Sequence, residues 1–147
     1  MRDLKRGSLY EGVIVPTALY RAETWGMRSA ERRNVNVLEM KCLRSLAGVS
    51  RMDRVRNEEV RRRAGIGRKL ASRVDQRVLR WFGHLERMNE SRLARRVMTA
   101  EVGGWRVRSR LRIGWMEGVK VALGKRGMTV EAAREIGTSG EPWCVCK

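Results

Sequence analysis

The stretch LASRVDQRVLRWFGHLERM, which runs from Leu70 to Met88, carries the pattern that decides the fold. Its apolar residues recur at intervals of three and four positions, so that in an α-helix they lie on one face. The members of this stripe are Leu70, Val74, Val78, Trp81, Leu85 and Met88. We therefore expect a long amphipathic helix, with Trp81 in the core and with Phe82 and His84 turned away from the centre of the stripe.

Ahead of this stretch, a second amphipathic helix is expected to begin after Ser29 and to end at Gly48. Ser29 is a candidate N-cap, and Glu31 would face the positive end of the helix dipole. The apolar stripe of this helix comprises Val35, Leu38, Cys42, Leu46 and Val49. Its spacing predicts that this face packs against the rest of the protein.

The segment 8–25 is apolar, but Gly12 and Pro16 interrupt it. Proline has no amide hydrogen and disfavours helix at the residue before it. We therefore expect one short helix before Pro16 and another after it. A strand over Val13–Val15 is the competing interpretation.

Three shorter helices are also expected. Asn57 can cap a short helix that Gly65 closes. This helix and the next one could form a helix-turn-helix, but our preferred interpretation is that the short helix is a plain connector. A helix is expected over 90–101, with its apolar residues buried. Thr129 can cap a last helix over 130–136.

Together these patterns predict a mainly α protein, an irregular bundle of about five to seven short helices with a basic, arginine-rich loop, which forms a partial domain. The sequence lacks the strand–helix alternation of an α/β sheet. We expect residues 29–136 to form the basic helical domain and residues 137–147 to form a divergent, disordered tail.

The charge balance points to an acidic partner. Against 33 Lys and Arg the chain has 16 Asp and Glu, which gives a net charge of +17 and a pI of about 11.4. Such an excess of positive charge attracts polyanions, and arginine suits the bidentate recognition of phosphate. We therefore expect RNA and/or DNA as the partner, and no membrane.

The arginines best suited to this role lie between two tryptophans. In WRVRSRLRIGW, from Trp105 to Trp115, arginine occupies every second position from Arg106 to Arg112. An extended backbone would place these side chains on one side, next to rings on which bases can stack. A solvated loop is the alternative interpretation of this run. For His84, the alternative is a side chain that is packed or simply exposed at the surface. The residues expected to contact nucleic acid are Arg61, Arg62, Arg63, Arg80, His84, Arg95, Arg96, Trp105, Arg106, Arg108, Arg110 and Arg112.

The sequence lacks the groupings that catalysis and cofactor binding need. The aspartates are Asp3, Asp53 and Asp75, and they include no adjacent pair of the kind that holds two metal ions. The single histidine rules out a site with two imidazoles. A soft-metal site formed by Cys144 and Cys146 together with Cys42 and His84 is a weaker alternative, because the spacing of the two C-terminal cysteines is unlike that of common zinc sites. We expect no catalytic residue, no metal and no cofactor.

We expect an intracellular protein, nuclear or cytoplasmic, that is not secreted. No signal-peptide pattern is visible, and the apolar run Val13–Val15 is too short to span a bilayer. Three cysteines do not make a disulfide framework, which agrees with a reducing compartment.

Several stretches in a fixed order resemble one known family. They are SLYEGVIVPTALYRAETW (8–25), NVLEMKCLRSLAGVSRMDRVRNEEVRRRAG (36–65), VLRWFGHLERM (78–88), RLARRV (92–97) and RVRSRLRIGWMEGVKVAL (106–123). Together they resemble the C-terminal region of reverse transcriptases from non-LTR retrotransposons, the LINE-type elements. The likeness extends over roughly residues 8–134, the span within which these stretches fall.

The resemblance implies a position downstream of the polymerase palm. Residues 1–28 would be a remnant of the thumb or its connecting segment, and an upstream polymerase domain of the full-length product would be a further partner. The catalytic palm is not part of the resemblance, so no catalytic residue is carried over. The implied role is a non-catalytic one of holding template RNA or target DNA. A helical protein-interaction module with an apolar face around 115–123, or a translated transposon fragment without function, are the alternatives.

The chain departs from the family pattern at three places. One is the segment after the last expected helix, where the family tends to have an arginine- and tryptophan-bearing stretch and this chain has GTSGEPWCVCK (137–147). The family commonly has glycine where Arg21 stands in LYRAETW. It commonly reads Arg-Gly-Arg-Pro-Arg where this chain has arginine, serine and leucine over Arg108–Arg112. The last of these departures changes the backbone of the expected basic strip, because it removes a glycine and a proline.

Overall fold

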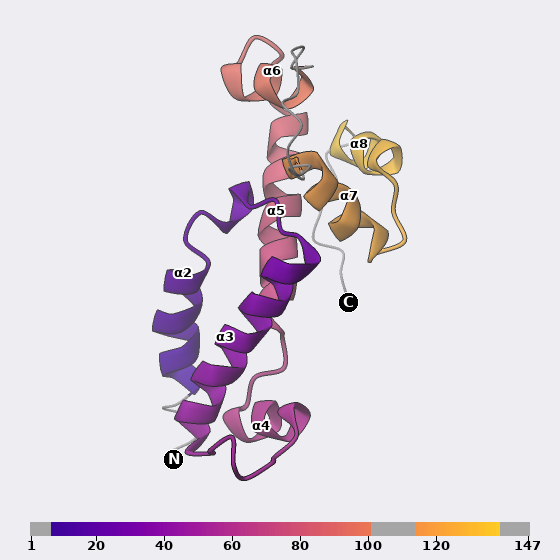
Figure 1. Ribbon diagram of the computed structural model, residues 1–147. Coiled ribbons are helices and arrows are strands. Elements are labelled where there is room, and N and C mark those ends of the chain that lie inside the picture. The colour runs from indigo at the N-terminus through magenta and orange to yellow at the C-terminus, as the bar shows by residue number, and fades with distance from the viewer. Residues whose placement is uncertain (1–6, 101–113, 139–147) are drawn as a thin grey trace, which may run out of the picture. The chain divides into compact units, whose positions relative to one another are not determined.

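The protein is seen here as a computed structural model that describes residues 7–100 and 114–138 (Figure 1). Every regular element within those ranges is helical, which confirms the mainly α fold. In chain order the elements are η1 (Tyr10–Ile14), α2 (Val15–Ala18), η2 (Ala22–Thr24), α3 (Ser29–Ala47), α4 (Asn57–Ala64), α5 (Leu70–Glu86), α6 (Leu93–Thr99), α7 (Trp115–Gly124) and α8 (Val130–Thr138).

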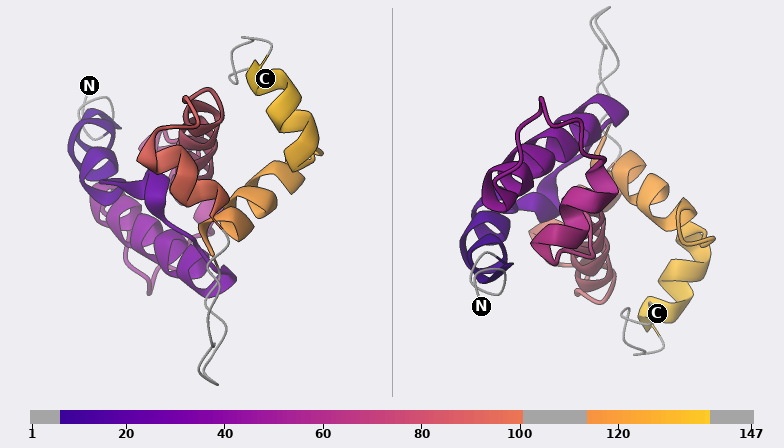
Figure 2. Two further views of the ribbon diagram at one scale, coloured as in Figure 1. Left: turned by 90° about the horizontal axis from the view of Figure 1, so that it is seen from above. Right: turned by 90° about the horizontal axis from the view of Figure 1, so that it is seen from below.

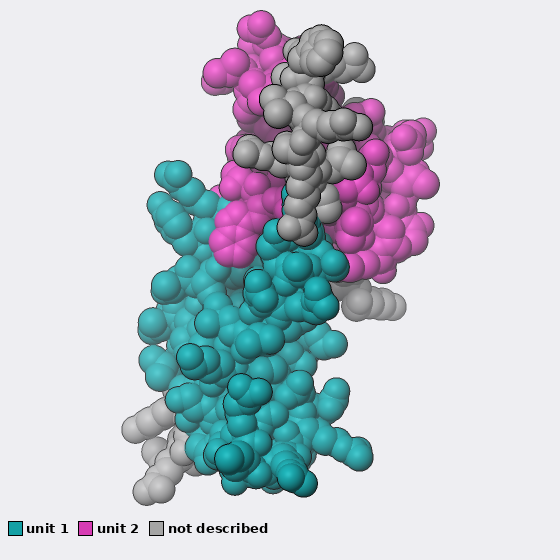
Figure 3. All heavy atoms as spheres, in the orientation of Figure 1, with its two compact units in different colours: residues 1–22, 27–74 teal, residues 23–26, 75–147 magenta. Residues whose placement is uncertain are grey.

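The chain divides into two compact units (Figure 3). Unit 1 comprises residues 1–22 and 27–74, and unit 2 comprises residues 23–26 and 75–147. The boundary falls within α5, so that its first residues belong to unit 1 and the remainder to unit 2.

In unit 1, residues 7–18 form one continuous helical segment that runs alongside α3 (Figures 1 and 2). The expected break at Pro16 and the alternative strand over Val13–Val15 are both wrong. Instead the helix widens into the π-turn η1 just before the proline, where the Val15 amide donates to the Tyr10 carbonyl. A wide turn accommodates a residue that has no amide hydrogen and whose ring would collide with the preceding turn of an α-helix.

The buried face of α3 differs from the expected one. Glu39, Met40 and Leu43 are its buried residues, whereas Leu38, a member of the expected stripe, is 46% exposed. One residue corresponds to a rotation of about 100° around a helix. The face is turned because the Glu39 carboxylate is drawn into the interior by partners that only the tertiary structure supplies.

The helix α5 confirms most of the expected stripe. Leu70, Val74, Val78 and Leu85 are buried, as are Leu79 and Phe82. The expectation for the aromatic pair is wrong, because Phe82 is fully buried and Trp81 is only half-buried. Phe82 follows Val78 by four residues and therefore continues the same face.

The helix ends were largely predictable. Gly48 and Gly65 follow α3 and α4 in the left-handed backbone region, with φ of 66° and 69°, as expected for C-terminal glycines. Thr129 caps α8, since the Ala132 amide donates to its hydroxyl at 3.2 Å. Asn57 is the first residue of α4 rather than its cap.

In unit 2, α7 and α8 pack against each other, while α6 lacks a buried face (Figure 2). Leu93 and Val97, expected to be buried, are 71% and 65% exposed, so that expectation is wrong. The helix is also shorter than expected, and an ion pair of Arg95 fastens it instead of apolar burial. No helix in the described ranges is both long enough and apolar enough to cross a membrane.

The turn that follows α2 holds a residue in a strained conformation. Arg21 has a φ of 53°, in the left-handed region that L side chains rarely adopt. Glycine enters this region without a steric cost.

Candidate nucleic-acid interface

A buried carboxylate organises unit 1. Glu39 on α3 is fully buried and accepts hydrogen bonds from the Tyr10 hydroxyl at 3.3 Å, from the Leu70 amide at 2.9 Å and from the guanidinium of Arg61. These contacts join η1, α3, α4 and the start of α5. Burial raises the pKa of the Tyr10 phenol, and the negative charge of Glu39 raises it further.

Arg61, an expected phosphate contact, is therefore tied to the interior. Its side chain is 15% exposed and forms an ion pair with Glu39. Arg44 on α3 fastens the other end of α4, because its Nη2 donates to the Val55 carbonyl at 2.8 Å and to Asn57 Oδ1 at 2.9 Å. The two arginines hold α4 against α3 and so define the space between these helices.

That space is a groove of about 900 Å³. Its lining residues are Asn36, Val37, Met40, Lys41, Arg44, Ser45, Val49, Arg51, Asn57, Glu58, Arg61 and Lys69. Five of them are cationic and one is a carboxylate, so that the lining carries a net charge of 5 − 1 = +4. The site was missed in the sequence because its residues come from two helices and two loops, and their spacing along the chain shows no single pattern.

Three of the five cations are available to a ligand. Lys41, Arg51 and Lys69 are exposed, and within the described part of the chain their side chains form no ion pair. Like charges that line one groove attract anions to it. Val37, Met40 and Val49 give the same groove an apolar portion.

The two other arginines of the 61–63 run lie outside the groove lining and share one carboxylate. Arg62 and Arg63 are exposed and both form ion pairs with Glu59. Hydrogen bonds from these arginines lower the pKa of Glu59 to about 2, and Glu59 in turn raises the pKa of Arg62. Since two cations face one carboxylate, the cluster keeps a positive charge for a phosphate.

On α5, His84 and Trp81 form an aromatic pair, with ring centroids 5.3 Å apart. His84 and the neighbouring Arg80 are exposed, as is Arg96 on α6. An exposed imidazole beside a half-buried indole offers a surface on which a base can stack. The expected contacts Arg80, His84 and Arg96 thus lie at positions that a ligand can reach.

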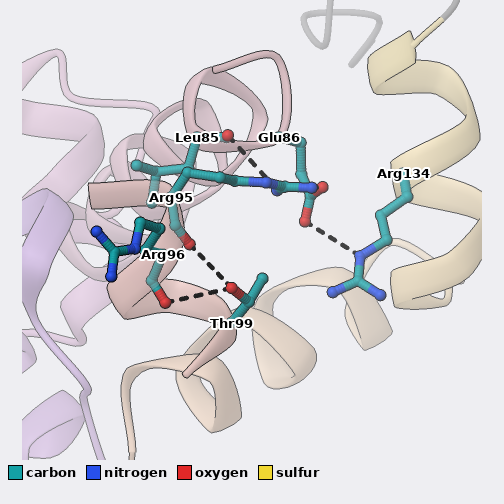
Figure 4. Close-up of polar contacts among 6 residues, drawn as sticks. All are labelled: Leu85, Glu86, Arg95, Arg96, Thr99 and Arg134. Atoms are coloured by element: carbon teal, nitrogen blue, oxygen red, sulfur yellow. Dashed lines mark hydrogen bonds and ion pairs between the residues drawn. The ribbon is translucent and has the colours of Figure 1, made fainter. Parts of the chain in front are cut away.

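Arg95 has a different environment. Its side chain is 17% exposed and pairs with Glu86, which is 4% exposed and also binds Arg134 at 3.1 Å (Figure 4). A guanidinium nitrogen of Arg95 also approaches the Leu85 carbonyl at 3.5 Å. This cluster holds α6 and α8 against the end of α5. Arg95 therefore stabilises the fold, and its guanidinium is already engaged by Glu86.

The arginine-rich run, with Trp105, Arg106, Arg108, Arg110 and Arg112, lies outside the described residues. Trp115, which closes that run, is described. Its indole nitrogen donates to the Glu23 carbonyl at 2.8 Å, and its ring lies 6.4 Å from that of Phe82. Both contacts fall within unit 2, where Trp115 acts in packing.

The described aspartates are engaged in structural contacts. Asp53 accepts a hydrogen bond from the Ser50 amide at 2.7 Å, and Asp75 forms an ion pair with Lys125 at 2.8 Å. Within 7–100 and 114–138, no three His, Cys, Asp or Glu side chains gather in a way that could hold a metal ion. Cys42 is a half-buried free thiol.

Comparisons with protein-family models, with curated proteins and with solved structures each found no match to this chain. The chemistry of the site itself indicates what it can bind. A preformed concave surface with excess cations and an apolar portion can bind a phosphate-bearing molecule that also presents an apolar group. Nucleotides have both features.

Proposed function

We propose that this protein binds nucleic acid, either template RNA or target DNA, and that it catalyses no reaction on it. The observation that carries this proposal is the groove between α3 and α4, in which five cations face one carboxylate. Further exposed cations, among them Arg80 and Arg96, extend the basic character to unit 2.

The overall charge supports the same partner. If each of the 16 carboxylates neutralised one of the 33 cations, 33 − 16 = 17 cations would still lack a counter-charge. The ion pairs of the structure therefore cannot consume the positive charge. A polyanion that spreads its charges over the surface relieves this repulsion and releases counterions when it binds.

A holding role, without chemistry, fits the environment of the acidic groups. Asp75, Glu39 and Glu86 each have cationic partners of their own within the described residues. Carboxylates committed in this way contribute to stability, whereas nucleotidyl transfer needs several of them converging on metal ions.

The resemblance suggests where such a protein comes from. We propose that the chain corresponds to the region downstream of the palm in a non-LTR retrotransposon reverse transcriptase, and that it works in the nucleus or cytoplasm. In that setting a site for single strands next to a polymerase would help to hold the template or the target. The alternative of a protein-interaction module rests on the apolar residues around α7, of which Val119 and Leu123 are buried and Val121 is 42% exposed.

The proposal is tested by a salt titration of binding to fluorescent RNA and DNA oligonucleotides. If about five phosphates are neutralised, log K falls against log salt with a slope of about −3.5 for single strands and about −4.5 for duplex DNA. A slope near zero, or no binding by micromolar protein at moderate salt, contradicts the proposal. Nucleotide incorporation in a primer-extension assay with Mg²⁺ or Mn²⁺ contradicts its non-catalytic part.

A further inference from the structure

We propose that the groove between α3 and α4 seats one unstacked nucleotide of a single strand, with its phosphate on Lys41, Arg51 and Lys69 and its base against Val37, Met40 and Val49. This inference rests on the proposed function and narrows it from nucleic acid in general to single-stranded nucleic acid. The proposed contact lies in a groove whose lining includes only one of the nucleic-acid contacts predicted from the sequence, Arg61.

The size and shape of the groove favour a nucleotide over a bare duplex backbone. Its volume of about 900 Å³ is large enough for one nucleotide, and the site is an open groove, which a strand can enter from the side. A duplex keeps its bases stacked inside and presents mainly phosphates and sugars to a protein, whereas a single strand can place an unstacked base on a protein surface. The apolar residues of the groove can therefore contact a base of a single strand, whereas the stacked bases of a duplex do not reach them.

The walls of the groove are preformed. Arg44 is held by Val55 and Asn57, and Arg61 is held by the buried Glu39, so that α3 and α4 are fastened before any ligand arrives. Binding to such a site orders few side chains, which reduces its entropic cost.

Three polar atoms of the lining have hydrogen-bonding capacity left over. Arg44 Nη1, Arg61 Nε and Asn36 Oδ1 are buried and have no hydrogen-bond partner in the structure. These atoms are covered, and the Arg44 and Arg61 side chains are held by their other contacts, so the proposed seating of a nucleotide does not depend on them.

The charges of the lining set the order of preference among ligands. Lys41, Arg51 and Lys69 attract a phosphate, while Glu58 on the same groove opposes a high density of negative charge. One phosphodiester with a base attached therefore fits the lining better than free inorganic phosphate, which offers the apolar residues nothing.

The first test is lysine acetylation footprinting of the full chain, read by mass spectrometry, with an oligouridylate as the probe. We expect the oligonucleotide to slow the acetylation of Lys41 and Lys69 several-fold and to leave Lys120 on α7 unchanged. Lys120 is exposed and belongs to unit 2, so it is the internal control. Uridine 5′-monophosphate should protect the same two lysines at higher concentration, and inorganic phosphate should protect them less.

The second test compares two triple variants of equal charge. The groove variant carries Lys41→Ala, Arg51→Ala and Lys69→Ala, and the matched control carries alanine at exposed cations outside the groove lining, namely Arg33, Arg92 and Lys120. Loss of the one phosphate that the three cations hold should make the salt slope for a single strand shallower by about 0.7, whereas the control should keep its slope. Circular dichroism of both variants confirms that they are folded.

The outcomes separate the two proposals. If the wild-type chain binds no oligonucleotide, the proposed function itself is wrong. If it binds while Lys41 and Lys69 stay unprotected and the groove variant keeps the wild-type slope, nucleic acid binds elsewhere and only this inference is wrong. Equal protection by duplex and single strand, or by inorganic phosphate and nucleotide, overturns the seating of a base.

Discussion

Replacing Glu39 with alanine should be among the most damaging single substitutions in unit 1. The change removes an acceptor from the Tyr10 hydroxyl, the Leu70 amide and Arg61, all of which meet in the interior. It leaves the guanidinium of Arg61, only 15% exposed, without its counter-charge. Breaking a buried ion pair by removing one partner costs about 3–5 kcal/mol, a large part of the roughly 5–15 kcal/mol that stabilises a typical domain.

The assay is urea unfolding followed by circular dichroism, with a double-mutant cycle between Glu39 and Arg61. Because the unpaired charge causes most of the damage, Glu39→Ala combined with Arg61→Ala should lose less than the sum of the two single losses, with a coupling energy of about 2–3 kcal/mol. Glu59→Ala is the control, since that carboxylate is partly exposed and, within the described residues, pairs only with the exposed Arg62 and Arg63, so its removal should cost less than about 1 kcal/mol. A loss below about 1 kcal/mol for Glu39→Ala, or additive losses in the cycle, would refute the reasoning.

Three further predictions concern single residues. Arg21→Gly should raise the free energy of unfolding by about 0.5–1 kcal/mol because it relieves the positive φ, whereas Arg21→Ala, which keeps the strain, should not, as urea unfolding will show. Tyr10→Phe should cost about 1 kcal/mol by removing the hydrogen bond to Glu39. The raised pKa of Tyr10 also means that wild-type stability is complete below the ordinary tyrosine pKa of 10.0 and falls as pH rises above it, and a pH series of melting curves should show a weaker fall for Tyr10→Phe. The lowered pKa of Glu59 means that its contribution to stability is present above pH 4.5 and is lost as pH falls toward about 2, and an NMR titration should show its midpoint returning toward 4.5 in Arg62→Ala.

Local patterns in the sequence were enough to predict several of the helices, α3, α4, α5 and α8 among them. The stripe that starts at Leu70 fixed the position of α5, and Gly48 and Gly65 marked helix ends because only a left-handed residue closes them in this way. Such signals depend on neighbours within a few positions, and they survive in the folded chain.

Features that depend on contacts distant in the sequence were not predictable. The buried face of α3 is set by Glu39, whose partners Tyr10 and Leu70 lie about thirty positions away on either side. A pattern of apolar residues treats a glutamate as solvent-facing, and so it selected the wrong face. The exposure of Leu93 on α6 was missed for a related reason, since an ion pair, not apolar contact, fastens that helix.

The positive charge of the candidate site was predictable from the sequence, but its location in the fold was not. The excess of arginine predicted phosphate recognition, and Arg80, His84 and Arg96 are exposed as that role requires. Arg61 and Arg95, however, are committed to buried carboxylates. Whether an arginine faces solvent or a buried carboxylate is decided by packing, which neighbouring residues in the sequence do not reveal.

The central claim, that this cationic helical protein binds a nucleic-acid strand through its phosphates, is tested most directly by removing the charge from the strand. The affinity of the full chain is measured for one sequence as a phosphodiester oligonucleotide and as an uncharged peptide nucleic acid. We predict that the phosphodiester strand binds with an affinity that falls as salt rises and that the uncharged strand does not bind. Equal affinity for both strands would contradict the account.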